Sequence, residues 1–113
     1  MTISRTATHD DRLQVVITSE TPLWYAHGAS DDEDRPAHVR AASSLAWIGE
    51  SIVVIQDDAN FAALIDPATR RARAIALPRG EEGLRQFDDV RGNKKYKLDL
   101  EACVAVPHDG RDT

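Results

Sequence analysis

The sequence predicts an all-β fold: an antiparallel four-stranded meander of the propeller-blade type, followed by the first strand of a second blade. The whole would be a partial β-propeller. Three observations predict it: short β-branched runs, tight turns between them, and a change along the runs from small to apolar to charged side chains. Because tight turns join neighbouring runs as hairpins, successive strands are expected to pair antiparallel in chain order.

The first two strands of the meander are expected at residues 43–48 and 51–56. Residues 43–48 (SSLAWI) combine small residues with alternating apolar positions, and Gly49-Glu50 supplies a two-residue turn. Residues 51–56 (SIVVIQ) are strongly β-branched, which favours a strand.

The last two strands of the meander are expected at residues 61–65 (FAALI) and 71–77 (RARAIAL). Residues 57–60 (DDAN) form a turn by composition, and residues 66–69 (DPAT) carry proline at the second turn position. Charged and apolar residues alternate in 71–77, as expected of an exposed outer strand. A small, buried first strand and a charged last strand are typical of a propeller blade between its axis and its rim.

The chain is expected to consist of a polar start and one β domain. The divisions are a disordered start (1–11) and a single domain (12–113) that holds a complete blade (42–78), a long polar loop (79–97) and the start of the next blade (98–113). Residues 13–19 (LQVVITS) predict a further short strand. Residues 101–105 align with residues 44–48, which predicts that 98–106 is the innermost strand of a second blade.

Composition excludes several classes of protein. A net charge of -5 argues against nucleic-acid binding, which needs a basic face. Cys103 is the single cysteine, so no disulfide forms within the chain, which fits a reducing compartment. The polar start has no signal-peptide pattern, and no apolar run is long enough to span a membrane. A cytoplasmic protein is the default expectation.

Four stretches carry a resemblance to known proteins: residues 44–47 (SLAW), 52–58 (IVVIQDD), 63–67 (ALIDP) and 99–102 (DLEA). They resemble bacterial six- or seven-bladed β-propellers of the group that includes the strictosidine-synthase-like, gluconolactonase-like and esterase-like phytase proteins. A closer similarity, over residues 86–102 (QFDDVRGNKKYKLDLEA), is to uncharacterised bacterial propeller proteins. The resemblance implies several blades, of which this sequence holds about one and a half.

An isolated blade would leave apolar surface uncovered. Its faces are apolar, and it is stable only when neighbouring blades cover them. Three alternatives follow: the chain is a truncated or frameshifted piece of a longer propeller, copies associate, or the chain closes on itself with residues 13–19 over the open edge. The expected partner is therefore a second copy or the missing remainder of a propeller.

Acidic residues near the predicted strands form a candidate metal site. Asp99 and Glu101 have i, i+2 spacing, so on a strand both would point to one face. Ca²⁺ takes six to eight oxygen ligands, which two carboxylates cannot supply. Asp57, Asp58 and Asn60 would add oxygens if the fold brings their turn close.

A basic loop lies just before this acidic pair. It offers a candidate site for a phosphate or a carboxylate, with the following residues: Arg91, Asn93, Lys94, Lys95 and Lys97. The alternative is a solvated loop that balances neighbouring carboxylates, with Lys97 or Arg91 donating to the acidic pair and pinning the loop.

No complete catalytic constellation is present in the sequence. There is no G-x-S-x-G motif, and Cys103 lies in an apolar run that favours a small buried side chain over a nucleophile. The expected function is a non-catalytic, propeller-derived β module that self-associates or belongs to a longer propeller, without a cofactor. The alternative is a Ca²⁺-dependent hydrolase of anionic small molecules at a propeller channel mouth. A remnant without selected activity is a third possibility.

Overall fold

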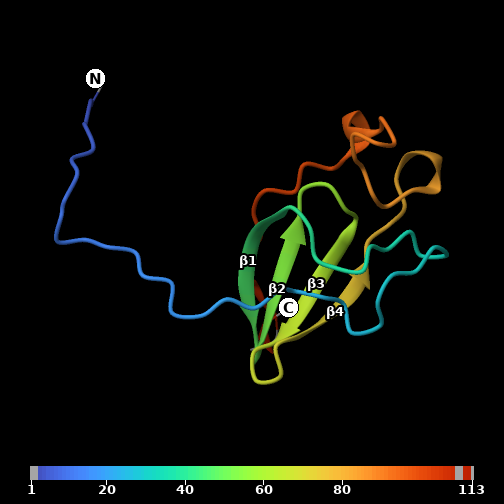
Figure 1. Cartoon of the computed structure of the whole chain (residues 1–113), viewed down its shortest axis with the longest axis horizontal. Coiled ribbons are helices and arrows are strands. Elements are labelled where there is room, and N and C mark those ends of the chain that lie inside the picture. The colour runs from blue at the N-terminus through green and yellow to red at the C-terminus, as the bar shows by residue number, and fades with distance from the viewer. Residues whose placement is uncertain (1–2, 109–110, 113) are drawn as a thin grey trace.

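A single antiparallel sheet forms the body of the chain, and the computed structural model describes residues 3–108 and 111–112 (Figure 1). Its strands are β1 (Ala42–Ile48), β2 (Ser51–Gln56), β3 (Phe61–Asp66) and β4 (Arg71–Ala76), in the order β1-β2-β3-β4. Each strand pairs antiparallel with the next in the chain. The expected all-β chain with a four-stranded meander is therefore confirmed.

The remaining regular elements are short. They are the 3₁₀ turns η1 (Glu81–Gly83) and η2 (Lys94–Tyr96) and a two-stranded pair of β5 (Pro107–His108) with β6 (Arg111–Asp112). Among the described residues, no helix is long and apolar enough to cross a membrane.

One face of the sheet carries the core, and we call it the core face. Directly paired residues in antiparallel strands share a face, so Val54 and Ala63 lie together on it. The segment that precedes β1 crosses this face, where Tyr25 N donates to Ala37 O (2.9 Å) and Val39 N donates to Leu23 O (2.9 Å). The resulting cluster consists of Tyr25, Val54, Ala63, Ile65 and Ala72, with Leu23, Val39, Ile52 and Ala74 packed against it.

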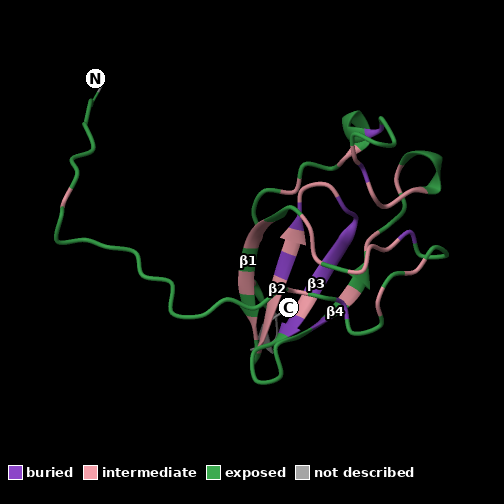
Figure 2. Ribbon diagram, viewed as in Figure 1, coloured by how far each residue is buried: buried purple, intermediate pink, exposed green. Residues whose placement is uncertain are grey.

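Burial across the sheet differs from the expected gradient. The sequence predicts a buried first strand, but β3 is the most buried strand and β1 is largely open (Figure 2). The reason is position: β3 has a neighbour on each side, whereas β1 is at the edge of the sheet. A first strand is buried in a propeller only through contacts with other blades.

The expected strand at residues 13–19 is wrong. These residues are extended and exposed, and within the described part of the chain they pair with no strand. Figure 1 shows this stretch leaving the body past the β1 edge. The radius of gyration is 17.4 Å, against about 13 Å for a compact chain of this length. A β-branched sequence alone does not make a strand, because its backbone groups need a partner.

The expected strand at residues 98–106 is also wrong. Asp99 has a φ of 53°, which turns the chain out of the extended conformation. The segment instead lies against the start of β1, where Ser43 Oγ donates to Leu100 O and Cys103 N donates to Ser44 Oγ (3.3 Å). The assignment of the sheet as a propeller blade and the existence of a second blade stay predictions. Part of the expected second blade, residues 109, 110 and 113, lies outside the described residues.

Candidate functional site

Three carboxylates predicted as metal ligands converge at one end of the sheet. Asp57, Asp99 and Glu101 offer oxygens that all lie within 4.8 Å of one another. The ammonium of Lys97 lies among them, with Nζ 2.6 Å from Asp57 Oδ2 and 3.0 Å from Asp99 Oδ1. We call these four residues the charge cluster.

Two local features build the charge cluster. Asp57 follows β2 directly, and its N–H donates to Ala41 O (2.9 Å), which fixes the chain at the strand end. Lys97 follows the turn η2, where its N–H donates to Lys94 O (3.2 Å). The positive φ of Asp99 then folds the next residues back toward Asp57. The i, i+2 strand geometry expected for the acidic pair is absent, yet the carboxylates meet.

Interactions within the charge cluster shift the pKa values of its groups in opposite directions. The hydrogen bond from Lys97 lowers the pKa of Asp57, and the same pairing raises the pKa of Lys97. The pKa of Glu101 is raised, first because a protonated Glu101 shares its proton with Asp57, and then because its ionised form would face the charge of Asp57. The cluster therefore favours one lysine cation with ionised Asp57 beside it.

This arrangement limits what the cluster can bind. The lysine ammonium already occupies a position between two carboxylates, so a divalent cation would compete with it. Three carboxylates also fall short of the six to eight oxygens of a Ca²⁺ site. The fourth predicted ligand, Asp58, lies outside the cluster, because its Oδ2 pairs with Arg40 Nη2 at 2.9 Å.

The basic loop makes mainly internal contacts. Arg91 pairs with Asp34, Lys94 pairs with Asp89 at 3.1 Å, and the Lys95 ammonium lies 5.1 Å from the Tyr96 ring centroid. Asn93 is buried, where its Nδ2 donates to Gln86 O (3.0 Å) and its Oδ1 accepts from Asp88 N (2.9 Å). These contacts match those of a loop that balances nearby carboxylates. Anion binding by this loop stays a prediction.

A buried carboxylate that the sequence did not single out organises the loops. Asp34 is 8% exposed and accepts hydrogen bonds from the backbone N–H groups of Arg85 (2.7 Å) and Gln86 (2.9 Å) and from Arg91. Burial alone would raise its pKa, but these donors lower it below the usual range. Its neighbours in the acidic run at residues 31–33 are exposed, and a run of acids gives no sequence signal for which one is buried.

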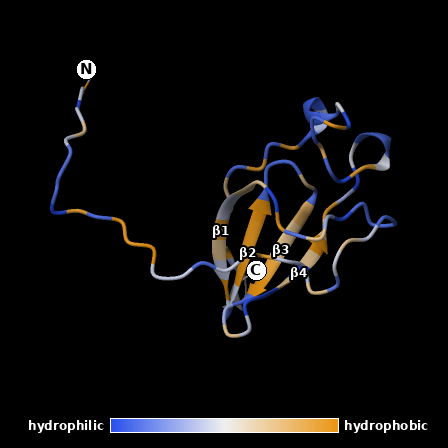
Figure 3. Cartoon of the chain, in the orientation of Figure 1, coloured by the Kyte–Doolittle hydropathy of each residue, from blue (hydrophilic) through white to orange (hydrophobic). Residues whose placement is uncertain are grey.

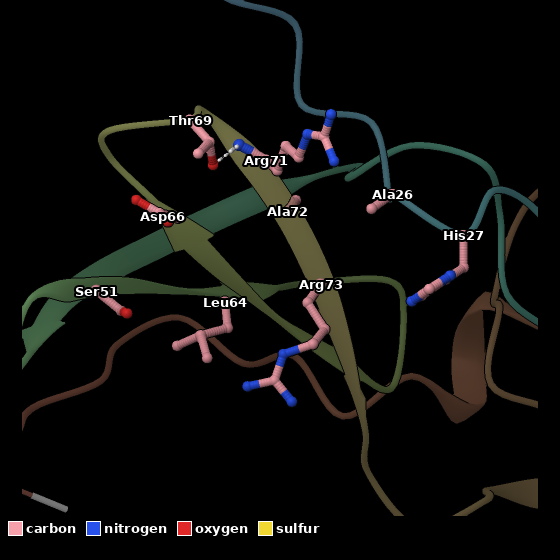
Figure 4. A pocket seen from close by; sticks show the side chains of 9 residues that line it. All are labelled: Ala26, His27, Ser51, Leu64, Asp66, Thr69, Arg71, Ala72 and Arg73. Atoms are coloured by element: carbon pink, nitrogen blue, oxygen red, sulfur yellow. Dashed lines mark hydrogen bonds between the residues drawn. The ribbon is translucent and has the colours of Figure 1, made fainter.

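A cavity of about 430 Å³, open to solvent, lies beside β4 and contains two arginines (Figure 4). Arg71 and Arg73 have no acidic partner among the described residues. Their guanidinium groups point away from each other in Figure 4, so they do not form a joint clamp for one anion.

The β1 edge carries an uncovered apolar pair. Leu45 pairs with Val54 and Trp47 pairs with Ile52, which places both side chains on the core face. Nevertheless Leu45 is 62% and Trp47 55% exposed. A cavity of about 310 Å³ beside Leu45 is also lined by Leu23 and Val54. We call Leu45 and Trp47 the bare strip.

Residues 38–113 match the model of a family of unknown function, DUF6929. The chain belongs to this family. Comparisons with curated proteins and with solved structures find no match. The DUF6929 match includes the whole sheet, the bare strip and the charge cluster, and it begins after Asp34.

Proposed function

We propose that this DUF6929 chain is a non-catalytic assembly module, a blade-type sheet that works by packing its bare strip against a second copy. The observation that carries the proposal is the exposure of Leu45 and Trp47 on the face that elsewhere forms the core. Exposed apolar surface contiguous with a core marks interaction sites, whereas single scattered apolar residues do not.

Aromatic and aliphatic side chains in such a position favour protein contacts. Tryptophan is enriched at the energetic centres of interfaces, and the cavity beside Leu45 gives a partner side chain a place to enter. The strand itself (ASSLAWI) carries no charge in a chain that is 29% charged. Two copies, each with a net charge of -5, would therefore meet most readily at this uncharged strand.

The propeller resemblance supports the same role. In a propeller, the faces of each blade pack against the blades beside it, and a single blade needs such neighbours. A second copy would supply that neighbour for the bare strip. The remainder of a longer propeller would supply it equally well, and the test below separates the two.

The competing hypothesis is a Ca²⁺-dependent hydrolase centred on the charge cluster. The convergence of three carboxylates favours it, and the lysine ammonium among them opposes it. Calcium titration of thermal unfolding separates the two ideas. A rise in melting temperature that disappears in Glu101→Ala would support the hydrolase, and an unchanged melting temperature would count against it.

Sedimentation velocity over a range of concentrations tests the assembly module. We expect the wild-type chain to associate reversibly and Trp47→Lys to shift the equilibrium toward monomer. Val90→Lys is the matched control, because Val90 is 98% exposed and lies outside the sheet, between η1 and η2. A wild-type chain that stays monomeric at every concentration contradicts self-association and favours the missing remainder of a propeller.

A further inference from the structure

The segment of residues 13–19, which we call the N-terminal arm, combines the sequence of a strand with the exposure of a linker. It contains no charged residue, and its apolar side chains Leu13, Val15, Val16 and Ile17 are 70–97% exposed. Figure 3 shows this hydrophobic stretch outside the sheet. Short uncharged β-branched segments pair readily with any open sheet edge.

The two edges of the sheet differ in how they are protected. At the β4 edge, Ala26 N donates to Ala72 O (2.9 Å), and Arg71 and Arg73 add charge. The β1 edge has neither charge nor proline. The side chains of Ser43 and Ser44 contact residues 100–103, but within the described residues β1 pairs as a strand only with β2. Natural edge strands usually carry a charged residue or a proline, or are covered by another segment, which prevents pairing with a further strand. The β1 edge is thus the open one.

The N-terminal arm and β1 match in length and composition. β1 has 7 residues and no charge, and a strand of this length spans about 23 Å. The arm covers the same number of positions and is likewise uncharged, so pairing them would bring no charge to the interface.

Local geometry directs the N-terminal arm away from its own sheet. Arg70 Nη1 donates to Thr21 Oγ1 (2.9 Å), which holds the base of the arm near the β3–β4 turn. Pro22 restricts Thr21 to an extended conformation, so the chain continues outward instead of reversing. The arm leaves past the β1 edge in Figure 1.

The exposed apolar area of the bare strip is too small to hold two copies together by itself. Leu45 and Trp47 together expose on the order of 250 Å², so two bare strips would bury about 500 Å². Stable interfaces bury roughly 1,200–2,000 Å². The bare strip therefore needs an additional contact surface. The arm offers apolar side chains together with a backbone that, within the described residues, pairs with no strand.

We propose that the N-terminal arm of one copy adds as a strand to the β1 edge of a second copy. This inference rests on the proposed assembly function and names its second contact. Backbone hydrogen bonds to β1 would supply affinity, and the apolar side chains of the arm would cover Leu45 and Trp47 from the edge.

Sedimentation velocity of full-length variants tests the arm. Val16→Pro removes one N–H and fixes φ in the middle of the arm, which prevents strand pairing. Ala7→Pro, in the exposed segment before the arm, is the matched control. We expect Val16→Pro to raise the dissociation constant at least about tenfold and Ala7→Pro to leave it unchanged. A peptide of residues 12–20 should bind the Val16→Pro protein and slow amide exchange in β1.

The possible outcomes distinguish the arm from the proposed function. If Val16→Pro associates as the wild type does while Trp47→Lys does not, the arm proposal is overturned and the assembly module stands. If the wild type is monomeric but its β1 amides lose protection in Val16→Pro, the arm pairs with its own sheet and the second-copy proposal is overturned. If the wild type is monomeric and its β1 amides are not protected by the arm, both the arm proposal and the assembly module are overturned.

Discussion

Asp34 and Arg91 form a two-point ion pair across 57 positions of the chain, with Arg91 Nη1 2.9 Å from Asp34 Oδ2 and Nη2 2.8 Å from Oδ1. The pair ties the loop before the sheet to the loop after it. Because two parallel bonds fix both distance and orientation, the pair positions the polar stretch that leads into the charge cluster.

Asp34→Asn should destabilise the chain by about 2–3 kcal/mol, because the amide offers one acceptor oxygen fewer and no charge to the Arg91 guanidinium and the backbone N–H groups of Arg85 and Gln86. This loss of stability is smaller than that expected for a fully buried ion pair, because the Arg91 side chain is 35% exposed. Urea unfolding gives the measurement. Asp32→Asn, at an exposed position of the same acidic run, should stay within about 0.5 kcal/mol. Equal losses in both variants would contradict the account.

The lowered pKa of Asp34 also predicts how stability depends on pH. Its contribution is fully present above the ordinary aspartate pKa of about 3.9 and is lost as the pH falls through the lower native value. We expect the free energy of unfolding to fall more steeply below about pH 4 in the wild type than in Asp34→Asn. The same slope in both proteins would contradict this.

Gln56 is fully buried, and its amide group satisfies three partners. Its Nε2 donates to Tyr25 Oη (2.8 Å) and Phe61 O (2.9 Å), and its Oε1 accepts from Arg40 N (2.8 Å). Gln56→Leu leaves two backbone groups unpaired, so we expect a loss of about 3–5 kcal/mol from two unsatisfied groups and lost packing.

Tyr25→Phe is the control for this network, because it removes one hydroxyl and leaves the contacts of Gln56 with the backbone intact. We expect it to lower the free energy of unfolding by about 1 kcal/mol. Thermal or urea unfolding of both variants gives the comparison. A Gln56→Leu variant no less stable than Tyr25→Phe would refute the role assigned to Gln56.

The charge cluster predicts a titration that depends on Asp57. The pKa of Glu101 should lie above its usual value in the wild type and fall toward it in Asp57→Asn, because the hydrogen bond from protonated Glu101 to the Asp57 carboxylate and the neighbouring negative charge are both lost. Carboxyl carbon NMR titration measures this directly. Asp89→Asn, at the exposed Lys94 pair, should not move the titration of Glu101. An unchanged pKa of Glu101 in Asp57→Asn would show that the two groups do not interact.

Local sequence patterns predicted the sheet well, because hairpin pairing depends on residues that are near in the chain. The run 51–56 and the turn Gly49-Glu50 predicted the hairpin of β1 and β2, although not the irregularity of its register between Ala42 and Ser44. Strand prediction failed where pairing depends on something else. Residues 13–19 have no partner within the described chain, and Asp99 has a positive φ that its neighbours do not signal.

The candidate sites were predictable only in part. Asp57 was grouped with Asp99 and Glu101 from their chemistry, and the fold brings these three together. The sequence grouped Asp58 with Asp57 because both are aspartates in the same turn. In the structure their side chains point in different directions, as those of adjacent residues do after a strand, and Asp58 pairs with Arg40 instead. Asp34 depends on a partner 57 positions away, a relationship that local patterns do not encode.

The fluorescence of Trp47 reports directly on the proposed burial of the bare strip between associated copies. The chain has 2 tryptophans, so a Trp24→Phe background leaves Trp47 as the single reporter. Acrylamide quenching should be strong in dilute solution and weaken as the protein concentration rises, with a blue shift of the emission. Quenching that is equally strong at every concentration would contradict the account.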